Sequence, residues 1–398
     1  MLLVIAADRM KVSFYMIISI CLLLVSCSGN KKQTMQKSMH EIKLDIEEVL
    51  CPVSEVLNLK SYHLSSAFHN DSLNLLYGYN YKSHALDCID MLHHTISEIV
   101  LSDQGESAIM HRVCGLFVQA PDSIWLYDDT QRIFLLNSVG QVLKVINLQN
   151  ELKEGEQVLI NSNHAMSTAR LYYDKGHNSL LYGVKDFSSS PISFKVRETF
   201  LSDTISSMDY PLQASVVIPD VGEGDYANMS DPNINFTEQK IMYNYPVESH
   251  IYVMDRDSKK TEVINADSRN TKNVAGKCES KQDYSKWERH GIENPHFYDV
   301  MYLPVSDMYA RLHLGEEEFD ATRDLLELES SRSLYLTLFD KDFILMDEKK
   351  LPSHRYSYFT GWGAISDGIV IYVDNILDKN EKTEELAFDI IRLKQNKE

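Results

Sequence analysis

The chain has 398 residues, of which 44% are hydrophobic, 24% are charged and 10% are aromatic. This balance is typical of a chain that folds into one large domain or two ordinary ones, and it excludes disordered chains, collagen-like repeats and small disulfide scaffolds. The 39 Lys and Arg residues against 58 Asp and Glu residues give a formal net charge of −19. A surface of that sign repels phosphate, so we expect no nucleic-acid partner.

Residues 1–26 are predicted to form an export signal. Residues 17–25 are an almost unbroken apolar run that follows Met10 and Lys11. The run is shorter than the roughly 20 residues that a membrane-spanning helix needs, but it has the length of the apolar core of a signal peptide. A signal without lipidation, or an anchoring helix, is the alternative interpretation of this segment.

The predicted signal ends in Leu24-Val25-Ser26-Cys27, which resembles the lipobox of bacterial lipoproteins. This resemblance implies that the chain is cut before Cys27 and that the Cys27 thiol carries a lipid. Residues 27–40 would then be the lipidated cysteine and a polar tether. Because two or more acyl chains hold a protein stably in a membrane, we expect a lipid-anchored protein of the bacterial cell envelope, on the periplasmic or surface side. Ser28 stands in place of the Asp that retains some lipoproteins at the inner membrane, which favours the outer membrane.

A short phrase of turn and strand residues repeats after residue 60. An acidic, amide or serine residue is followed by a small or polar one and then by an apolar strand that contains tyrosine. The six copies are 51 to 68 residues apart and begin at Asp71, Asp122, Asn178, Glu238, Ser306 and Ser366. A near-constant period of this size is typical of a radial or stacked repeat, and it predicts a β-propeller with six blades.

Each period divides into the four strands of a propeller blade. In the second period the predicted strands are residues 116–119, 123–127, 132–137 and 141–148. The sixth period ends after its third strand, at residues 386–393, which would leave an unpaired edge. The alternating residues 42–46 precede the first blade and are predicted to supply the missing strand, which closes the ring.

We therefore predict an all-β fold in which residues 41–398 form one six-bladed propeller domain. A seven-bladed ring, in which residues 270–294 split the longest spacing, is the alternative. A lipobox, a polar tether and six irregular blades together resemble the lipoproteins of gut-dwelling anaerobic bacteria whose propellers are grouped with the TolB-like six-bladed class. Such families are mostly described as domains of unknown function, so the resemblance implies a location and a fold and gives no residue a role.

No residue pattern in the sequence predicts a catalytic, metal or cofactor site. The chain has no Gly-x-Ser-x-Gly turn, no P-loop, no dinucleotide-binding glycine pattern and no His-Glu-x-x-His. Asp255-x-Asp257 resembles part of a calcium loop, but the downstream acid is missing, so we expect a plain hairpin turn there.

Four cysteines follow the predicted lipidation site, at Cys51, Cys88, Cys114 and Cys278. An even number of cysteines in an oxidising compartment is compatible with two disulfides. Their irregular spacing and strand-like surroundings equally suit small buried side chains. The sequence leaves both interpretations open.

Five side chains that are or can become cationic, together with one amide, are expected to meet at one mouth of the central channel. They stand just before or at the inner strands: His63, Arg112, Arg170, Asn233, His296 and Arg355. Such a ring would concentrate positive potential in one concave place and could hold a carboxylate, sulfate or phosphate. The alternative is that these are ordinary strand-start residues, because a shift of one residue turns a strand side chain to the other face.

A second set of candidate binding residues is aromatic and falls in predicted loops: Tyr79, Tyr81, Tyr245, Trp287, Tyr356, Tyr358, Phe359 and Trp362. Exposed rings would stack on sugars or grip a peptide. Because tyrosine is also a favoured strand residue that packs between sheets, we favour core filling for each residue taken singly.

The sequence favours a binding or scaffolding protein over an enzyme, because binding requires nothing that the sequence lacks. We expect a monomer that presents a propeller face to a glycan, a peptide or a partner protein of the envelope. The alternative is an envelope hydrolase or lyase that uses His and Arg residues at the channel mouth for proton transfer and charge stabilisation. Propellers host both classes, so the fold does not choose between them.

Overall fold

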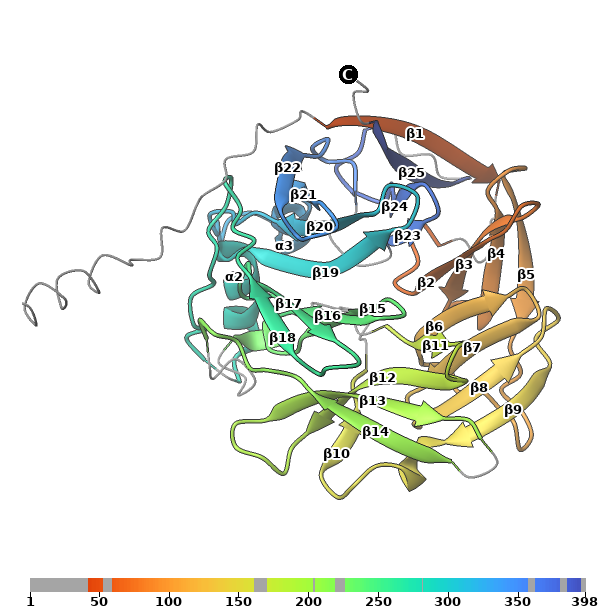
Figure 1. Cartoon of the computed structure of the whole chain (residues 1–398). Coiled ribbons are helices and arrows are strands. Elements are labelled where there is room, and N and C mark those ends of the chain that lie inside the picture. The colour runs from red at the N-terminus through yellow and green to blue at the C-terminus, as the bar shows by residue number, and fades with distance from the viewer. Residues whose placement is uncertain are drawn as a thin grey trace, which may run out of the picture. The chain divides into compact units, whose positions relative to one another are not determined.

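The computed structural model describes residues 42–52, 59–160, 170–202, 205–218, 226–280, 282–356, 362–379 and 385–394. The predicted export signal, Cys27 and the polar tether lie outside the described residues. Residues 40–398 form one compact unit. In this unit six antiparallel sheets surround a common centre, which is the six-bladed propeller that the repeated phrase predicts (Figure 1).

The first three blades follow one another along the chain. Blade 1 consists of β2 (Ser65–His69), β3 (Asn74–Asn80), β4 (Ala85–Asp90) and β5 (Thr95–Val100). Blade 2 consists of β6 (Val113–Ala120), β7 (Ser123–Asp128), β8 (Arg132–Leu136) and β9 (Val142–Asn147). Blade 3 consists of β10 (Glu156–Val158), β11 (Tyr172–Asp174), β12 (Ser179–Asp186), β13 (Ser193–Phe200) and β14 (Ser206–Pro211). The four strands predicted for the second period are confirmed.

The last three blades complete the ring. Blade 4 consists of β15 (Asn233–Phe236), β16 (Lys240–Asn244), β17 (Ile251–Asp255) and β18 (Thr261–Ile264). Blade 5 consists of β19 (His296–Leu303), β20 (Met308–Leu314), β21 (Leu334–Phe339) and β22 (Leu345–Lys350). Blade 6 consists of β23 (Gly363–Ile365), β24 (Gly368–Tyr372), β25 (Glu385–Lys394) and the N-terminal strand β1 (Lys43–Pro52).

The turns between strands explain why Asn and Asp recur in the repeated phrase. Asn178 and Asp307, in the turns that follow the inner strands of blades 3 and 5, both have a φ angle of +49°. Asn and Asp adopt this left-handed conformation more readily than most residues with a β-carbon. The hairpin turn predicted at Asp255 is confirmed, and the Asp255 side chain accepts a hydrogen bond from the Ser258 backbone nitrogen at 2.8 Å.

β1 closes the ring as the outer strand of blade 6. It pairs antiparallel with β25, from Lys43 opposite Lys394 to Pro52 opposite Glu385, and Figure 1 shows the two strands side by side. Ile42, Val49 and Cys51 are at most 3% exposed, so this segment also contributes to the core. The predicted closure is confirmed, and the strand is longer than the predicted residues 42–46.

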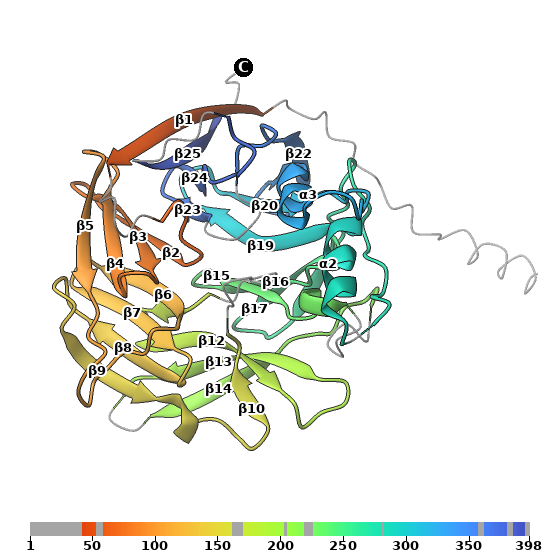
Figure 2. The ribbon, with the colours of Figure 1, turned by 180° about the vertical axis from the view of Figure 1, so that it is seen from behind.

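The longest spacing between copies holds a helix instead of a seventh blade. α2 (Tyr284–Glu293) begins after Asp283, whose side chain accepts a hydrogen bond from the Ser285 nitrogen. It contacts α3 (Leu325–Ser331), which interrupts blade 5 after the acidic residues 316–324, and Figure 2 shows the two helices side by side next to the blades. The seven-bladed alternative is therefore wrong.

Within the described part of the chain, two short 3₁₀ helices lie in connections between strands. They are η1 (Leu148–Asn150) and η3 (Ala227–Met229). Among the described residues, no helix is both long and apolar enough to cross a membrane.

The core lies between neighbouring blades, where aromatic rings fill the space. Four of the eight proposed aromatic platforms belong to this core, because they are at most 4% exposed: Tyr79, Tyr245, Tyr356 and Trp362. Core filling is confirmed for these four. Tyr81 is 45% exposed, Trp287 is half-buried, and Tyr358 and Phe359 lie outside the described residues.

The four cysteines that the structure describes are free thiols, and Cys51 and Cys114 are fully buried. Burial raises the pKa of the Cys51 thiol to about 11 and that of Cys114 to about 12. Both thiols therefore stay protonated and unreactive at neutral pH. The interpretation as small buried side chains holds for these two residues.

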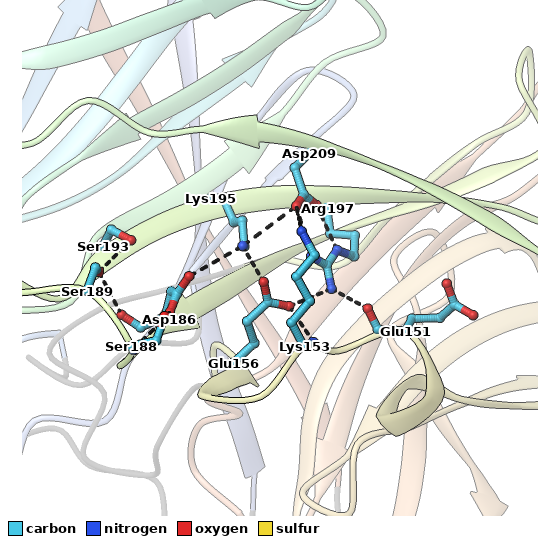
Figure 3. A network of polar contacts seen from close by, with 10 residues as sticks. All are labelled: Glu151, Lys153, Glu156, Asp186, Ser188, Ser189, Ser193, Lys195, Arg197 and Asp209. Carbon is cyan, nitrogen blue, oxygen red and sulfur yellow. Dashed lines mark hydrogen bonds and ion pairs between the residues drawn. The ribbon is translucent and has the colours of Figure 1, made fainter.

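Blade 3 differs from the other blades because two strands share its inner edge. β10 and β11 both pair with β12, β10 opposite residues 184–186 and β11 opposite residues 179–181. A network of ion pairs ties β10 to the outer strands (Figure 3). Arg197 on β13 contacts Glu156 on β10 at 2.8 Å and Asp209 on β14 at 2.7 Å, and Lys195 also contacts Glu156. The side chains of Arg197 and Glu156 are 2% and 0% exposed, so the network lies inside the blade.

Candidate functional site

The centre of the propeller holds a cavity of about 790 Å³. The inner strands of all six blades contribute residues to its lining, from β2, β6, β11, β15, β19 and β23. Turns that follow the inner strands add polar side chains such as Glu238 and Asp307. Small-molecule sites in proteins occupy roughly 300–1,000 Å³, so the cavity has room for a ligand of two or three rings.

An ion pair between Arg170 and Asp299 joins the blades beside this cavity. The Nε of Arg170 donates to Asp299 at 3.0 Å, and its Nη1 and Nη2 donate to the carbonyls of Ser65 and Trp362 at 3.5 and 3.2 Å. Asp299, which is 1% exposed, also accepts hydrogen bonds from Asn235 Nδ2 and Trp362 Nε1 at 3.0 and 2.9 Å. These residues belong to blades 1, 3, 4, 5 and 6, so one hydrogen-bonded group connects five of the six blades.

Aromatic rings form part of the cavity lining on three consecutive blades. Phe117 of blade 2 lies edge-on to Tyr172 of blade 3 with ring centres 5.2 Å apart, and Tyr172 lies 5.8 Å from Phe236 of blade 4. Burial raises the pKa of the Tyr172 hydroxyl to about 12, so the ring stays neutral and its hydroxyl keeps its proton. This part of the lining offers flat apolar surface with one hydroxyl.

Lys240 of the lining places its ammonium group beside two aromatic rings, of which Tyr309 also lines the cavity. Its Nζ donates to the Tyr309 hydroxyl at 3.2 Å and lies 5.4 Å from the ring centres of both Tyr309 and Phe343. A cation over an aromatic face is stabilised by the ring quadrupole. Within the described residues, no carboxylate forms an ion pair with Lys240, so its positive charge is not neutralised by a direct partner.

The remaining polar side chains of the lining come mainly from turns. The Tyr302 hydroxyl donates to Asp307 at 3.0 Å, and Lys341 pairs with Asp342 at 2.9 Å. His69, at the end of β2, makes no hydrogen bond or ion pair with a carboxylate of the described chain. The turns therefore contribute carboxylates and one lysine, whereas the inner strands contribute mostly aromatic and small residues.

Arg170 is the member of the predicted cationic ring that lines the cavity. His63 lies next to the rings of Tyr79 and Tyr81, with ring centres 6.4 and 6.0 Å apart, and Arg112 is exposed at the start of blade 2. Neither residue is among those that line the cavity.

The other three members of the predicted ring lie away from the cavity lining. Asn233 is buried and donates to the Phe297 carbonyl at 2.8 Å. His296 is fully buried, with its ring 4.4 Å from that of Tyr298. Arg355 contacts the two outer strands of blade 6, Asp389 of β25 at 2.6 Å and Glu48 of β1 at 2.9 Å. A ligand-binding role for the set stays a prediction.

Sequence reasoning missed two residues that shape this region. No sequence pattern gives Asp299 a role, and Lys240 belongs to the copy of the repeated phrase that begins at Glu238. Neither carries a local signal, because Asp299 finds its partner Arg170 across 129 residues and Lys240 meets Tyr309 across 69 residues. A cation repeated at the start of the second strand of each blade would have singled out Lys240. The other copies of the phrase have no cation at this position.

A group of side chains outside the cavity has the spacing of metal ligands. Ligand atoms of Asp174, His177 and Glu198 lie within 4.8 Å of one another in blade 3. Arg256 of blade 4 donates to Asp174 at 2.7 Å and to Glu198 at 2.9 Å. The Arg256 guanidinium thus supplies the positive charge that these carboxylates face, and its ion pairs join blades 3 and 4.

The sequence matches the profile of one protein family. The family is described as a domain of unknown function, DUF4221, and the match covers residues 37–350. No functionally curated protein matches the sequence.

Several solved structures are similar to this chain. A member of the DUF4221 family from Bacteroides vulgatus is 16% identical and superposes with a TM-score of 0.70, over 90% of this chain and 99% of that one. A candidate exported protein from Bacteroides fragilis is 12% identical, with a TM-score of 0.49 over 88% of this chain and 95% of that one. Regucalcin, a calcium-binding protein from Agrobacterium tumefaciens, is 12% identical, with a TM-score of 0.43 over 87% of this chain and 96% of that one. The first likeness supports the fold, and none of the three assigns a ligand to this chain.

Proposed function

This chain belongs to the DUF4221 family, and we propose that it is a lipid-anchored protein of the bacterial cell envelope that binds a small ligand in the central cavity of its propeller. The observation that carries the proposal is the cavity itself. Its volume of about 790 Å³, its contributions from all six blades and its mixture of rings, cations and carboxylates are those of a small-molecule site.

The polar groups of the cavity are better suited to holding a ligand than to moving protons. General acid–base catalysis requires a proton donor and a proton acceptor within hydrogen-bond reach of the substrate, commonly a histidine oriented by an acid. His69 has no such partner in the described chain, and Arg170 and Lys240 are held by Asp299 and Tyr309. Binding therefore has better support than the hydrolase or lyase alternative.

The envelope location rests on the sequence of the N-terminus. The apolar run of residues 17–25 and the sequence Leu24-Val25-Ser26-Cys27 support export and lipidation at Cys27. Replacing Cys27 with Ala should abolish incorporation of a fatty-acid label and release the protein from the membrane fraction. A labelled Cys27→Ala chain, or an unlabelled wild-type chain, would contradict the anchor.

A substitution that fills the cavity tests the binding site without assuming the chemistry of the ligand. A β-carbon added at Gly363 of β23, which lines the cavity, meets no atom within 4 Å. Gly363→Phe should therefore place a ring in open space and block the cavity. Gly276→Phe is the matched control, because Gly276 lies outside the lining and an added β-carbon there meets its nearest atom at 3.7 Å.

The measurement is a thermal-shift screen of the domain against neutral and acidic oligosaccharides, dipeptides and small carboxylates. A ligand at a hundred times its dissociation constant stabilises a protein by about 2.7 kcal/mol, which raises the melting temperature by several degrees. We expect this rise in the wild-type and Gly276→Phe chains and its loss in Gly363→Phe. An equal rise in all three chains, or no rise with any compound, would contradict binding in the cavity.

A further inference from the structure

We propose that the ligand of the central cavity is a sugar that carries a carboxylate, such as a uronic acid or a short oligomer of one. This inference rests on the proposed function, because it names the ligand class of the same cavity. Three features of the lining carry it: the cationic side chains of Arg170 and Lys240, the aromatic surface that blades 2 to 4 contribute, and the carboxylates of the turns.

Arg170 offers hydrogen-bond donors beyond those that hold it in place. A guanidinium group has five N–H donors, and Arg170 makes three hydrogen bonds, to Asp299, Ser65 and Trp362. Two N–H groups have no partner within the described residues, and the side chain lines the cavity while remaining 20% exposed. A carboxylate accepts a pair of such donors with charge assistance.

Lys240 adds a second positive charge to the same lining. One of its three N–H donors is used by the Tyr309 hydroxyl, and its Nζ lies 5.4 Å from the centres of the Tyr309 and Phe343 rings. Asp255 lies opposite Lys240 on β17 and its carboxylate is influenced by the lysine charge, but the two side chains form no direct ion pair. An anionic ligand would complete this arrangement.

The aromatic and acidic side chains make a sugar a better fit than a small inorganic anion. Phe117, Tyr172 and Phe236 present ring surfaces against which the apolar face of a pyranose can pack. Glu238 and Asp307 would repel the several charges of a phosphate or sulfate, but their oxygens accept hydrogen bonds from hydroxyl groups. A sugar acid can place its carboxylate near Arg170 or Lys240 and its hydroxyls near the turns. It therefore suits both the cations and the acidic side chains of the lining.

The test compares digalacturonic acid with the matching neutral disaccharide of galactose by isothermal titration calorimetry. The wild-type domain should bind the acidic disaccharide at least ten times more tightly. Lys240→Gln should lower the affinity for the acidic disaccharide about ten-fold and leave the neutral one unchanged. Lys240→Arg keeps the charge and should retain most of the preference.

Lys259→Gln is the matched control for Lys240→Gln. Lys259 also lies over a tyrosine ring, 5.0 Å from the centre of Tyr210, but it is exposed and outside the cavity. Its replacement should leave both affinities unchanged. An equal loss in both glutamine variants would show a general effect of net charge and would overturn the role of Lys240.

The outcomes separate this inference from the proposed function. Equal binding of the acidic and neutral disaccharides, or stabilisation by a dipeptide but not by either sugar, would overturn the inference. The proposed function would survive both results, provided that Gly363→Phe abolishes the binding. No stabilisation by any compound of the screen would overturn both.

Discussion

Deleting β1 is expected to destroy the cooperative folding of the propeller. A chain that begins at Val53 loses the ten-residue pairing with β25 and the buried side chains of Ile42 and Val49. Burying a side chain of this size stabilises a protein by about 1.5–3 kcal/mol, whereas the net stability of a whole domain is about 5–15 kcal/mol. The deletion therefore removes a large part of the net stability, and it leaves the edge of β25 open to aggregation.

Circular dichroism and solubility measure the loss of folding that the deletion of β1 should cause. A chain that begins at Glu41 keeps β1 and should unfold in a single cooperative transition. The chain that begins at Val53 should be insoluble or unfolded at 25 °C, and a synthetic peptide of residues 41–52 should restore part of the soluble folded fraction. Equal melting temperatures for the two chains would show that β1 does not hold the ring closed.

Replacing Arg197 with Met is expected to lower the free energy of unfolding by about 3–5 kcal/mol, the usual cost of removing one partner from a buried ion pair. Methionine has a similar length and no charge, so Glu156 loses its guanidinium partner inside the blade and Asp209 loses a bidentate contact. Lys195 still contacts Glu156, which places the expected loss near the lower end of the range.

Acid should reduce the difference in the free energy of unfolding between wild type and Arg197→Met. Burial alone would raise the pKa of Glu156, but hydrogen bonds from the Lys153 backbone, Lys195 and Arg197 lower it from 4.5 to about 2. A lowered pKa in the folded state gives stabilisation that is complete above the unfolded value and is lost as the pH falls through the folded value. The wild type should therefore lose stability more steeply than Arg197→Met between pH 4.5 and pH 2.

Urea unfolding at pH 7 and pH 3 checks both expectations for Arg197. Arg323→Met is the control, because Arg323 pairs with Glu327 on the surface and such pairs contribute at most about 1 kcal/mol. An Arg197→Met chain that is as stable as the Arg323→Met chain at pH 7 would show that the network in blade 3 does not stabilise the fold.

The fold could be predicted from the sequence because its determinants are local and repeated. A turn residue followed by an apolar strand marks each blade, and the same phrase in six copies fixes the number of blades. The closing strand could be predicted for a different reason, because a blade with three strands leaves an edge that the alternating residues near the N-terminus can pair with. The split inner edge of blade 3 could not be predicted, since β10 and β11 are short and lack the repeated phrase.

The cavity lining could be predicted only in part, because it depends on which face each side chain occupies. Arg170 was selected for its place before an inner strand, and it does line the cavity. Arg355 was selected on the same ground, but its guanidinium reaches the outer strands of blade 6. A change of one residue in register reverses the direction of a strand side chain, and no pattern along the chain fixes that register near the channel.

Arg170 and Asp299 link the cavity to the fold. The hydrogen-bonded group around their ion pair connects five blades, so it positions the Arg170 guanidinium at the cavity and also holds the ring together. Rigid support of this kind is what a preorganised binding site requires, because little side-chain freedom is lost when the ligand arrives. The lipid anchor proposed at Cys27 would keep this site in the cell envelope.

A crystal structure of the domain with digalacturonic acid at saturating concentration tests the central claim most directly. We expect electron density for the disaccharide inside the propeller, with a sugar ring against Tyr172 and a carboxylate within hydrogen-bond distance of Arg170 or Lys240. Density on the outer surface of the blades, or an empty cavity at a concentration that saturates binding in solution, would contradict it.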